Sequence, residues 1–267
     1  MSNVSQYGVR RFGRVNWLGL WTLIRRENMR YLAIWQQTIF APLITAALFL
    51  LVFSIAIGPG RADVMGFDYV SFLAPGLLMM TVIQNSFANT SSSMLSAKVM
   101  GSIVDTLMPP LSPLEMTIGF LAGGIGRGLL IGAVLCLSMG LSLGIWVAHP
   151  IWTLAFVVLG GMFMGALGLL GSIYAYKFDQ MAAISNFVIT PLAFLSGTFY
   201  SIQALPSLMQ PLIHVNPMFY IIDGGRYSVL GVSDGSPWMA LAVICGANIC
   251  AVGLAWFWLS RGYRLKS

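Results

Sequence analysis

Long stretches without charged residues dominate the hydrophobic pattern of this chain. These runs lie between Arg30 and Arg61, Asp68 and Lys98, Arg127 and Lys177, Asp179 and Asp223, and Asp234 and Arg261. A helix of about 20 mostly apolar residues crosses the hydrocarbon core of a bilayer. The third run is long enough for two crossings, with a turn at His149 and Pro150 between two tryptophans, as at a membrane interface. The pattern predicts six spanning helices, at 33–58, 69–93, 114–144, 151–175, 181–200 and 236–259.

The basic residues indicate how these spans are oriented. Most of the 14 Lys and Arg residues lie before residue 33, near residues 98 and 177, or after residue 260. Cytoplasmic loops are enriched in Lys and Arg, so this distribution places both termini in the cytoplasm. We therefore expect a single domain over 1–267, with a cytoplasmic segment at 1–32, a six-span region at 33–259 and a cytoplasmic tail at 260–267.

Composition agrees with an all-α membrane protein. Hydrophobic residues make up 58% of the chain and charged residues only 8%, against roughly 25% charged in soluble domains. The net charge of +6 reflects the cytoplasmic loops, so we do not expect nucleic-acid binding. Cys136, Cys245 and Cys250 fall in predicted spans without ligand-like spacing, and His149 and His214 are isolated. We therefore expect no metal site.

A proline-rich stretch interrupts the apolar pattern between the second and third spans. Just upstream, apolar residues recur at steps of four, at Leu95, Val99, Ile103 and Leu107. This spacing predicts an amphipathic helix that lies along the membrane or against a partner. Pro109 should end this helix, while Pro113 and Glu115 suit the first turn of the third span. The residues alone fit an interfacial helix with a turn or a stiff docking elbow.

The segment before the first span has a similar pattern. Its apolar stripe consists of Trp17, Leu20, Trp21 and Ile24. Arginines lie beside this stripe, so the segment is predicted to be an amphipathic helix at the membrane surface. Its tryptophans and arginines would anchor the first span at the interface. Glycines at steps of four in the third and fourth spans, such as Gly124 and Gly128, predict closely packed helices.

The order of these features resembles a known family. The chain contains "MPPLSPLEMTIGF", a glycine-rich span, and then "TPLAFLSGTFYSIQALP" followed by "VNPMFYIIDGGRY". This order is similar to that of the type-2 ABC exporter permeases, the membrane subunits of polysaccharide, lipid and drug exporters. It is most like the branch of nodulation-factor and daunorubicin export permeases, over nearly the whole chain. The resemblance implies a bacterial inner-membrane homodimer, surrounded by membrane lipids, that binds two copies of a separate cytoplasmic ATPase subunit.

The resemblance also implies that ATP and Mg bind to the ATPase subunit, with no cofactor on this chain. A phosphate-binding loop requires G-x-x-x-x-G-K-[ST], and none of the three lysines lies in such a motif. The predicted spans contain no catalytic serine with a base, no aspartate pair and no zinc motif. We therefore expect a transporter subunit without enzymatic activity of its own.

By resemblance, the loop between the second and third spans contains the coupling helix that docks on the ATPase. The residues that would form this docking element are Lys98, Ser102, Asp105, Pro109, Pro110, Pro113 and Glu115. The N-terminal amphipathic helix would also bear on the ATPase and relay its motion. Anchoring of the first span remains an alternative role for that helix.

Polar residues inside the second and third spans mark a candidate substrate path. Arg127 lies near the middle of the membrane, where a charge is costly unless polar groups or water satisfy it. It would either belong to a path for an anionic substrate or tether a neighbouring helix. Because the second and fifth spans line a cavity in the resembling family, the proposed path comprises Asn85, Phe87, Asn89, Arg127, Phe187, Thr190 and Phe194. Hydrogen bonds between helices would explain the same polar residues.

The segment between the fifth and sixth spans is apolar but repeatedly broken by proline. This pattern predicts short helices that dip into the membrane from outside. Asp223 and Arg226 are three residues apart and would pair on a helix. By resemblance the segment is a re-entrant external gate, with Pro206, Asn216, Pro217, Tyr220, Asp223 and Arg226 as its residues.

Together these features predict the permease subunit of an ATP-driven ABC exporter that works by alternating access. Its substrate would be amphipathic, a lipid, a lipid-linked saccharide or a hydrophobic drug, taken from the cytoplasm or the inner leaflet. Two alternatives remain, a non-transporting membrane scaffold and an ATP-independent secondary transporter. Many secondary transporters contain inverted repeats. Coupling to ATP separates the exporter from both alternatives.

Overall fold

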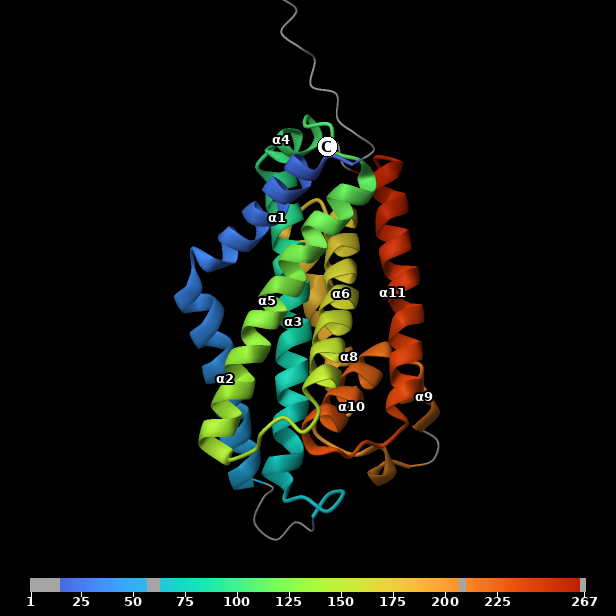
Figure 1. The fold of residues 1–267 in the computed structure, drawn as a ribbon. Coiled ribbons are helices and arrows are strands. Elements are labelled where there is room, and N and C mark those ends of the chain that lie inside the picture. The colour runs from blue at the N-terminus through green and yellow to red at the C-terminus, as the bar shows by residue number, and fades with distance from the viewer. Residues whose placement is uncertain (1–14, 57–62, 207–209, 265–267) are drawn as a thin grey trace, which may run out of the picture.

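The protein is all-α in the computed structural model, which describes residues 15–56, 63–206 and 210–264 (Figure 1). Parts of the predicted terminal segments, residues 1–14 and 265–267, lie outside the described residues. The elements are α1 Trp17–Leu32, α2 Trp35–Ala56, α3 Tyr69–Val99, α4 Ile103–Leu107, α5 Pro113–Leu143, α6 Pro150–Tyr174, α7 Phe178–Ile184, the π-helix η1 Ser185–Ile189, α8 Thr190–Phe194, the 3-10 helix η2 Ile202–Ala204, α9 Gln210–His214, α10 Pro217–Leu230 and α11 Pro237–Ser260.

Among the described residues, five helices are long and apolar enough to cross a membrane: α2, α3, α5, α6 and α11. They correspond to the predicted spans one to four and six. The span predicted at 181–200 corresponds to a continuous helical run over 178–194, in which the π-helix η1 separates the short helices α7 and α8. We call this run the broken segment. Six crossings therefore remain a prediction, with the broken segment in the place of the fifth.

Helix α3 is the centre of the bundle and packs against both α5 and α6 (Figure 1). Glycines on its neighbours allow this close approach, as the glycine spacing predicted. A Cβ atom added to Gly124 of α5 would lie 2.9 Å from Thr90 Cγ2, and one added to Gly128 would lie 2.5 Å from Ser86 Oγ. Thr90 of α3 also donates a hydrogen bond of 2.8 Å to the carbonyl of Gly165 on α6.

A section of α3 is rich in side chains that bond back to their own helix. The acceptors are carbonyls one turn earlier. Thr81 donates to Leu77 O at 2.7 Å, and Ser86 donates to Val82 O at 3.0 Å. Asn85 donates from Nδ2 to Thr81 O at 2.9 Å. Such bonds satisfy polar groups inside the membrane, and they tend to bend a helix slightly.

Helix α2 lies at the edge of the bundle (Figure 1). Only Thr38, Pro42 and Ala46 of this helix are buried. Apolar side chains such as Leu48 and Ile55 are more than half exposed, at 54% and 67%. An extended apolar surface of this kind suits contact with lipid or with another membrane subunit.

The loop after α3 differs from the single amphipathic helix predicted there. α3 ends at Val99, Gly101 has a φ of +74°, and α4 is a separate helix of five residues. A positive φ is unfavourable inside a right-handed helix but easy for glycine, so Gly101 breaks the predicted stripe. The predicted end before Pro109 is confirmed because α4 ends at Leu107. The predicted start of the third span is confirmed because Pro113 is the first residue of α5.

The molecule therefore has two distinct ends. One end carries α1, α4 and the end of α11, and we call it the α4 end (Figure 1). The opposite end carries α8, α9 and α10, and we call it the α10 end (Figure 1). The predicted topology places the α4 end in the cytoplasm. Because α3, α5 and α6 run from one end to the other, a movement at one end can be transmitted through them to the opposite end.

Candidate functional site

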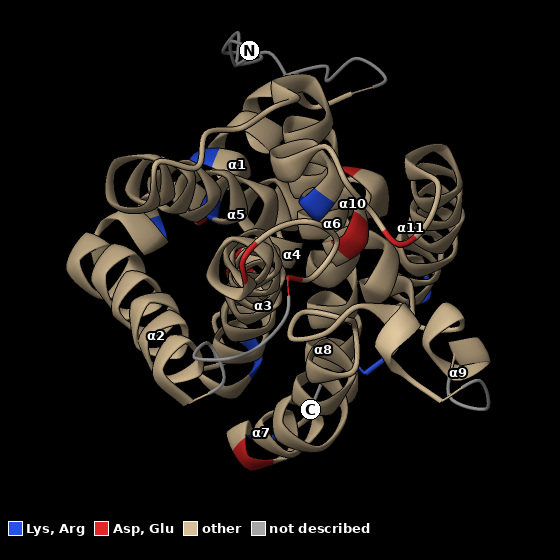
Figure 2. Ribbon diagram, turned by 90° about the horizontal axis from the view of Figure 1, so that it is seen from below, with Lys and Arg blue, Asp and Glu red and all other residues tan. Residues whose placement is uncertain are grey.

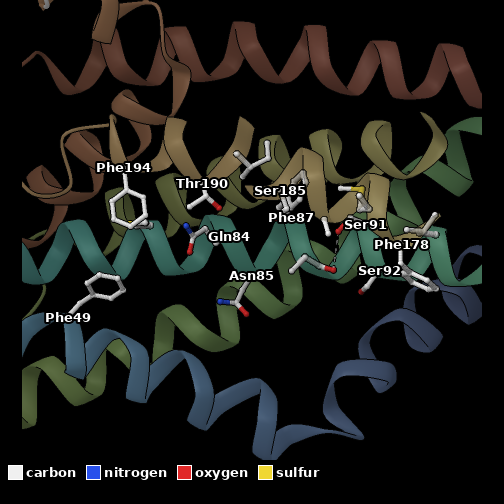
Figure 3. A pocket seen from close by; sticks show the side chains of 16 residues that line it. Phe49, Gln84, Asn85, Phe87, Ser91, Ser92, Phe178, Ser185, Thr190 and Phe194 are labelled. Atoms are coloured by element: carbon white, nitrogen blue, oxygen red, sulfur yellow. Dashed lines mark hydrogen bonds between the residues drawn. The ribbon is translucent and has the colours of Figure 1, made fainter. Parts of the chain in front are cut away.

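A cavity of about 690 Å³ lies between α3 and the broken segment, open to the surface of the chain (Figure 3). Phe49 of α2 and Phe194 of α8 face each other at one end, with ring centroids 6.3 Å apart. The polar lining comes mostly from one stretch of α3 and from η1 and α8. Its members are Gln84, Asn85, Ser91, Ser92, Ser185 and Thr190. Phe178 lies near Ser92 at the other end (Figure 3). The cavity thus combines aromatic rings with a polar wall, which suits an amphipathic ligand.

Four of the seven predicted path residues line this cavity: Asn85, Phe87, Thr190 and Phe194. Asn89 is fully buried against α1, and Arg127 lies behind Asn85. Phe187 does not line the cavity and is 81% exposed. It belongs to the π-helix, whose turn holds an extra residue, so α-helical spacing from Thr190 misplaces it. No sequence pattern pointed to Phe49, which reaches the cavity from the separate helix α2.

Arg127 contacts α3 through a side chain. Its Nη2 donates a hydrogen bond of 3.0 Å to Asn85 Oδ1. The tether predicted to a helix backbone is thus made to a side-chain amide, which itself lines the cavity. The Nε atom of Arg127 is buried and has no hydrogen-bond partner in the described part of the chain. This contact is of the kind that the tether hypothesis predicts, whereas Arg127 is not among the residues that line the cavity, so its role in a substrate path stays a prediction.

Helix α1 is attached to the same face of α3 by Arg30. The guanidinium donates to the backbone and side-chain oxygens of Asn89, at 2.6 and 3.0 Å, and to Ser92 Oγ at 3.1 Å. Glu27, which is only 1% exposed, lies 3.1 Å from Arg26 and 3.7 Å from Arg30. Burial lowers the pKa of Arg30 from its ordinary value, while the nearby Glu27 raises it. We call Glu27, Arg30, Asn89 and Ser92 the α1 junction.

The face that α1 buries differs from the predicted stripe. Leu20 is buried, but Trp17 and Trp21 are 73% and 63% exposed. The buried face instead includes Leu23 and Glu27, because α1 packs on α5. The exposed tryptophans keep the interfacial anchoring role that the sequence predicted for them.

Two of the predicted docking residues, Glu115 and Lys98, bond to backbone groups of neighbouring elements at the α4 end. Glu115 is 5% exposed and accepts hydrogen bonds of 2.6 Å from the backbone nitrogens of Asn16 and Ser112. It therefore joins the start of α1 to the start of α5. Lys98 Nζ donates to the carbonyls of Ser172, Ile173 and Ala175, at 3.0, 2.7 and 2.7 Å. It caps the end of α6, where the helix dipole favours a cation.

The other docking residues lie near a groove at the α4 end. Ser102, Asp105, Pro109 and Pro110 are exposed, and Pro113 is partly buried. A groove of about 310 Å³ runs between α1 and the loop after α4, with Asp105, Pro109 and Pro110 in its lining. Arg26 of α1 also donates to Thr106 Oγ1 at 3.0 Å. α1, α4 and the following loop thus form one connected surface.

The α10 end contains the fully buried Arg226. Figure 2 shows basic and acidic segments side by side on α10. Arg226 lies 3.5 Å from Asp223, which confirms the predicted pair, and 3.7 Å from Asp234. It also donates to Gly197 O at 2.6 Å and lies over the ring of Phe72, 4.1 Å from its centroid. We call Asp223, Arg226 and Asp234 the α10 lock. Sequence spacing missed Asp234 because it joins from the loop after α10.

The remaining residues of the predicted gate also lie at the α10 end. Asn216 caps α10 by accepting from Met218 N at 3.0 Å, and it donates to Leu192 O at 2.8 Å. Pro217 is the first residue of α10, and Tyr220 donates to His214 O at 3.1 Å. Pro206 is exposed in the loop after η2. The hydrogen bond from Asn216 to Leu192 connects the start of α10 with the end of the broken segment.

Comparison with known proteins places the chain in a family. Residues 19–230 match the model of the ABC-2 type transporter family. The inner membrane transport permease YadH of Escherichia coli strain K12 is 34% identical over 252 residues, covering 94% of this chain and 98% of that protein. Nodulation protein J of Sinorhizobium fredii strain NBRC 101917 / NGR234 is 24% identical over 238 residues, covering 86% and 87%. The chain belongs to the ABC-2 type transporter family and is a multi-pass inner-membrane permease subunit of an ABC transporter.

Proposed function

We propose that this permease exports an amphipathic substrate from the cytoplasm or the inner leaflet, driven by a separate ATPase subunit. The observation that carries the proposal is the cavity beside α3, which has aromatic residues at one end and amide and hydroxyl groups along its wall. A lipid, a lipid-linked saccharide or a hydrophobic drug has both kinds of surface. The cavity lies along a helix that reaches both ends of the bundle, as alternating access requires.

The ATPase, which would carry ATP and Mg, docks on the α4 end in this proposal. Met100, Val104 and Met108 are 76%, 53% and 77% exposed there, close to Asp105. An apolar patch with a charge beside it suits a protein partner. Glu115 and Arg26 connect this surface with α1, so a push on α4 would move α1 as well.

Two structural links would carry that movement to the cavity. Arg30 connects α1 to Asn89 and Ser92 of α3, and Lys98 connects the end of α3 to the end of α6. Movement of α3 against the broken segment would change the width of the cavity. Release of the α10 lock would then open the opposite end. The exposed face of α2 and the open side of the cavity support a homodimer with two ATPase subunits.

The test is reconstitution of the permease with its ATPase in proteoliposomes. We expect ATP-dependent movement of fluorescent lipid analogues, and co-purification of the two subunits. The double variant Asp105→Lys, Met108→Ser should reduce both, because it reverses the charge at residue 105 and removes an apolar contact of the docking surface. Asp63→Lys is the matched control, because Asp63 is exposed and lies at the end of the bundle opposite α4.

Three results would contradict the proposal. Transport without ATP would favour a secondary transporter, and a folded permease with neither ATPase nor transport would favour a scaffold. Unchanged co-purification in the double variant would remove the docking role of α4 while leaving export in place. Glu115 is a poor choice for this test, because its replacement would disturb the contact between α1 and α5.

A further inference from the structure

We infer that the permease binds a phosphate-bearing amphiphile, with the phosphate beside Arg30 and Arg127 and the apolar tail in the cavity. This inference rests on the proposed function and narrows its substrate class from amphipathic to anionic amphipathic. It depends on the geometry of one stripe of α3, on the balance of charges around that stripe, and on the hydrogen-bond donors there.

The stripe consists of Asn85, Asn89 and Ser92, which lie on one face of α3 because they are four and three residues apart. Arg127 approaches it from α5 and bonds to Asn85. Arg30 approaches it from α1 and bonds to Asn89 and Ser92. Asn85 and Ser92 are about 10 Å apart along the helix axis, at 1.5 Å per residue. Both also line the cavity, and Figure 3 shows them on the same side of α3.

The charges around this stripe do not balance. All eight acidic residues of the chain lie in its described part. Among them, Glu27 forms ion pairs with Arg26 and Arg30, whereas Asp223 and Asp234 pair with Arg226. No acidic residue in that part lies within ion-pair distance of Arg127. Arg26 and Arg30 thus share the carboxylate of Glu27, Arg127 has no carboxylate partner in the described part of the chain, and the stripe carries excess positive charge.

The unpaired groups on the stripe are mainly donors. A guanidinium has five N–H donors, and Arg127 uses one of them, on Asn85. Its buried Nε and the buried Nδ2 of Asn89 have no acceptor among the described residues. The Nε of Arg30 has Glu27 Oε2 as an ion-pair partner, at 3.7 Å, beyond hydrogen-bond distance. Donors in a positively charged, partly buried place suit an anion with several oxygens, and guanidinium groups match phosphate in particular.

The other end of the cavity argues for an amphiphile over free phosphate. Phe49 and Phe194 lie at that end with Met80 and Ile189 in the lining, away from Ser92 (Figure 3). A headgroup at Asn85 and Ser92 would leave an attached chain next to these apolar side chains. Because the cavity is open to the surface, such a chain would enter sideways from the membrane.

The inference is tested by binding to the purified permease without its ATPase. The titration is done in dodecyl maltoside, a neutral detergent with the same alkyl chain as dodecyl phosphate, so the detergent itself serves as the neutral competitor. We expect dodecyl phosphate, added in a calorimetric titration, to bind above this background, and inorganic phosphate to bind far more weakly. Arg127→Gln should weaken binding of dodecyl phosphate roughly tenfold or more, since a hydrogen-bonded charge is lost. Arg261→Gln, which removes an exposed charge from the end of α11, should leave it unchanged.

A second variant keeps the test valid if Arg127→Gln fails to fold. Asn85→Asp places a carboxylate on Arg127, which would satisfy the guanidinium and repel phosphate. We expect the same loss of binding with an unchanged or higher melting temperature. Unchanged affinity in Asn85→Asp, or an equal loss in Arg261→Gln, would overturn the inference. Competition by phosphatidylglycerol would identify the ligand as a bilayer lipid, and lack of competition would point to an exported amphiphile.

The binding test and the transport test can give opposite results, so each proposal can be contradicted without the other. ATP-driven transport of neutral amphiphiles, with no binding of dodecyl phosphate, would overturn the anionic site and leave export in place. Binding of dodecyl phosphate that depends on Arg127, in a permease that never couples to an ATPase, would support the site and contradict the proposed function.

Discussion

The two buried groups of charges in this permease differ in how completely they are satisfied. In the α10 lock, the charge of a single arginine is balanced by two carboxylates, and the arginine also bonds to a carbonyl oxygen, although its buried Nε has no hydrogen-bond partner among the described residues. At the stripe of α3, Arg30 shares the carboxylate of Glu27 with Arg26, Arg127 has no carboxylate within ion-pair distance, and donors remain without acceptors in the described structure. An arginine whose charge is balanced by carboxylates inside the protein holds the fold together. A charge that lacks them is positioned for something that arrives from outside the chain.

The strongest test of this comparison removes one arginine from each region. Arg226→Met would leave Asp223 and Asp234 buried without their cation, and we expect a loss of roughly 3–5 kcal/mol in the free energy of unfolding. Arg127→Met should cost far less, because a poorly paired charge inside the membrane is itself unfavourable. Thermal unfolding in detergent measures both. Equal losses would show that Arg127 is as structural as Arg226.

Glycine replacements compare the packing around the two regions. A Cβ atom on Gly76 would lie 2.8 Å from the backbone oxygen of Thr198 and 3.5 Å from Arg226, whereas one on Gly123 would lie 2.6 Å from Glu27 Cβ. We expect Gly76→Ala to cost about 1–3 kcal/mol in the free energy of unfolding, since backbone cannot give way easily. Gly123→Ala should cost less, because α1 can shift, but should lower coupled ATPase activity. Gly253→Ala, with open space around it, is the control.

Arg30→Lys tests the link between α1 and α3 while keeping its charge. A lysine lacks the planar fork that reaches Asn89 and Ser92 together, so we expect a loss of about 1 kcal/mol in the free energy of unfolding. The larger effect should be on ATP-driven transport, which would fall while ATPase docking persists. Transport at the wild-type rate would exclude Arg30 from the relay. Arg25→Lys, on an exposed position of α1, is the matched control.

The smallest expected change in stability concerns Glu27. Glu27→Gln keeps the shape of the side chain but removes the carboxylate that the arginines share. We expect little change in melting temperature and an increase of roughly threefold in affinity for dodecyl phosphate, because the net positive charge rises. Asp63→Asn removes an acid far from the stripe and should alter neither. A weaker affinity in Glu27→Gln would mean that Glu27 holds Arg30 in its binding position.

Much of the fold follows from the sequence because a bilayer imposes a simple rule on helix length. Charge-free runs predicted α2, α3, α5, α6 and α11, and proline chemistry predicted where α4 ends and α5 begins. The broken segment was not predicted, since an apolar run does not distinguish a straight helix from one with a π-turn. Gly101 was overlooked because a glycine is tolerated within an amphipathic pattern unless its φ is positive.

The candidate site was predictable only where one element supplies it. Asp223 and Arg226 are three residues apart on α10, so helical spacing was enough. Asn85 and Phe87 share α3, and both were expected because the second span lines a cavity in the resembling family. Contacts between distant elements were invisible to spacing. Lys98 finds carbonyls at the end of α6, and Glu115 finds the backbone of Asn16 across 99 positions of sequence. Both were expected on the docking surface because their charge was known but their neighbours were not.

The back-bonded section of α3 has a mechanical consequence. From Thr81 to Ser92, side chains share carbonyls with the helix backbone, so individual backbone bonds there lengthen with little loss of total bonding. The central helix would therefore bend more easily beside the cavity. Strain applied at the α4 end would concentrate in that soft section as curvature. The permease would then store part of the movement driven by the proposed ATPase as elastic bending of α3 beside the cavity.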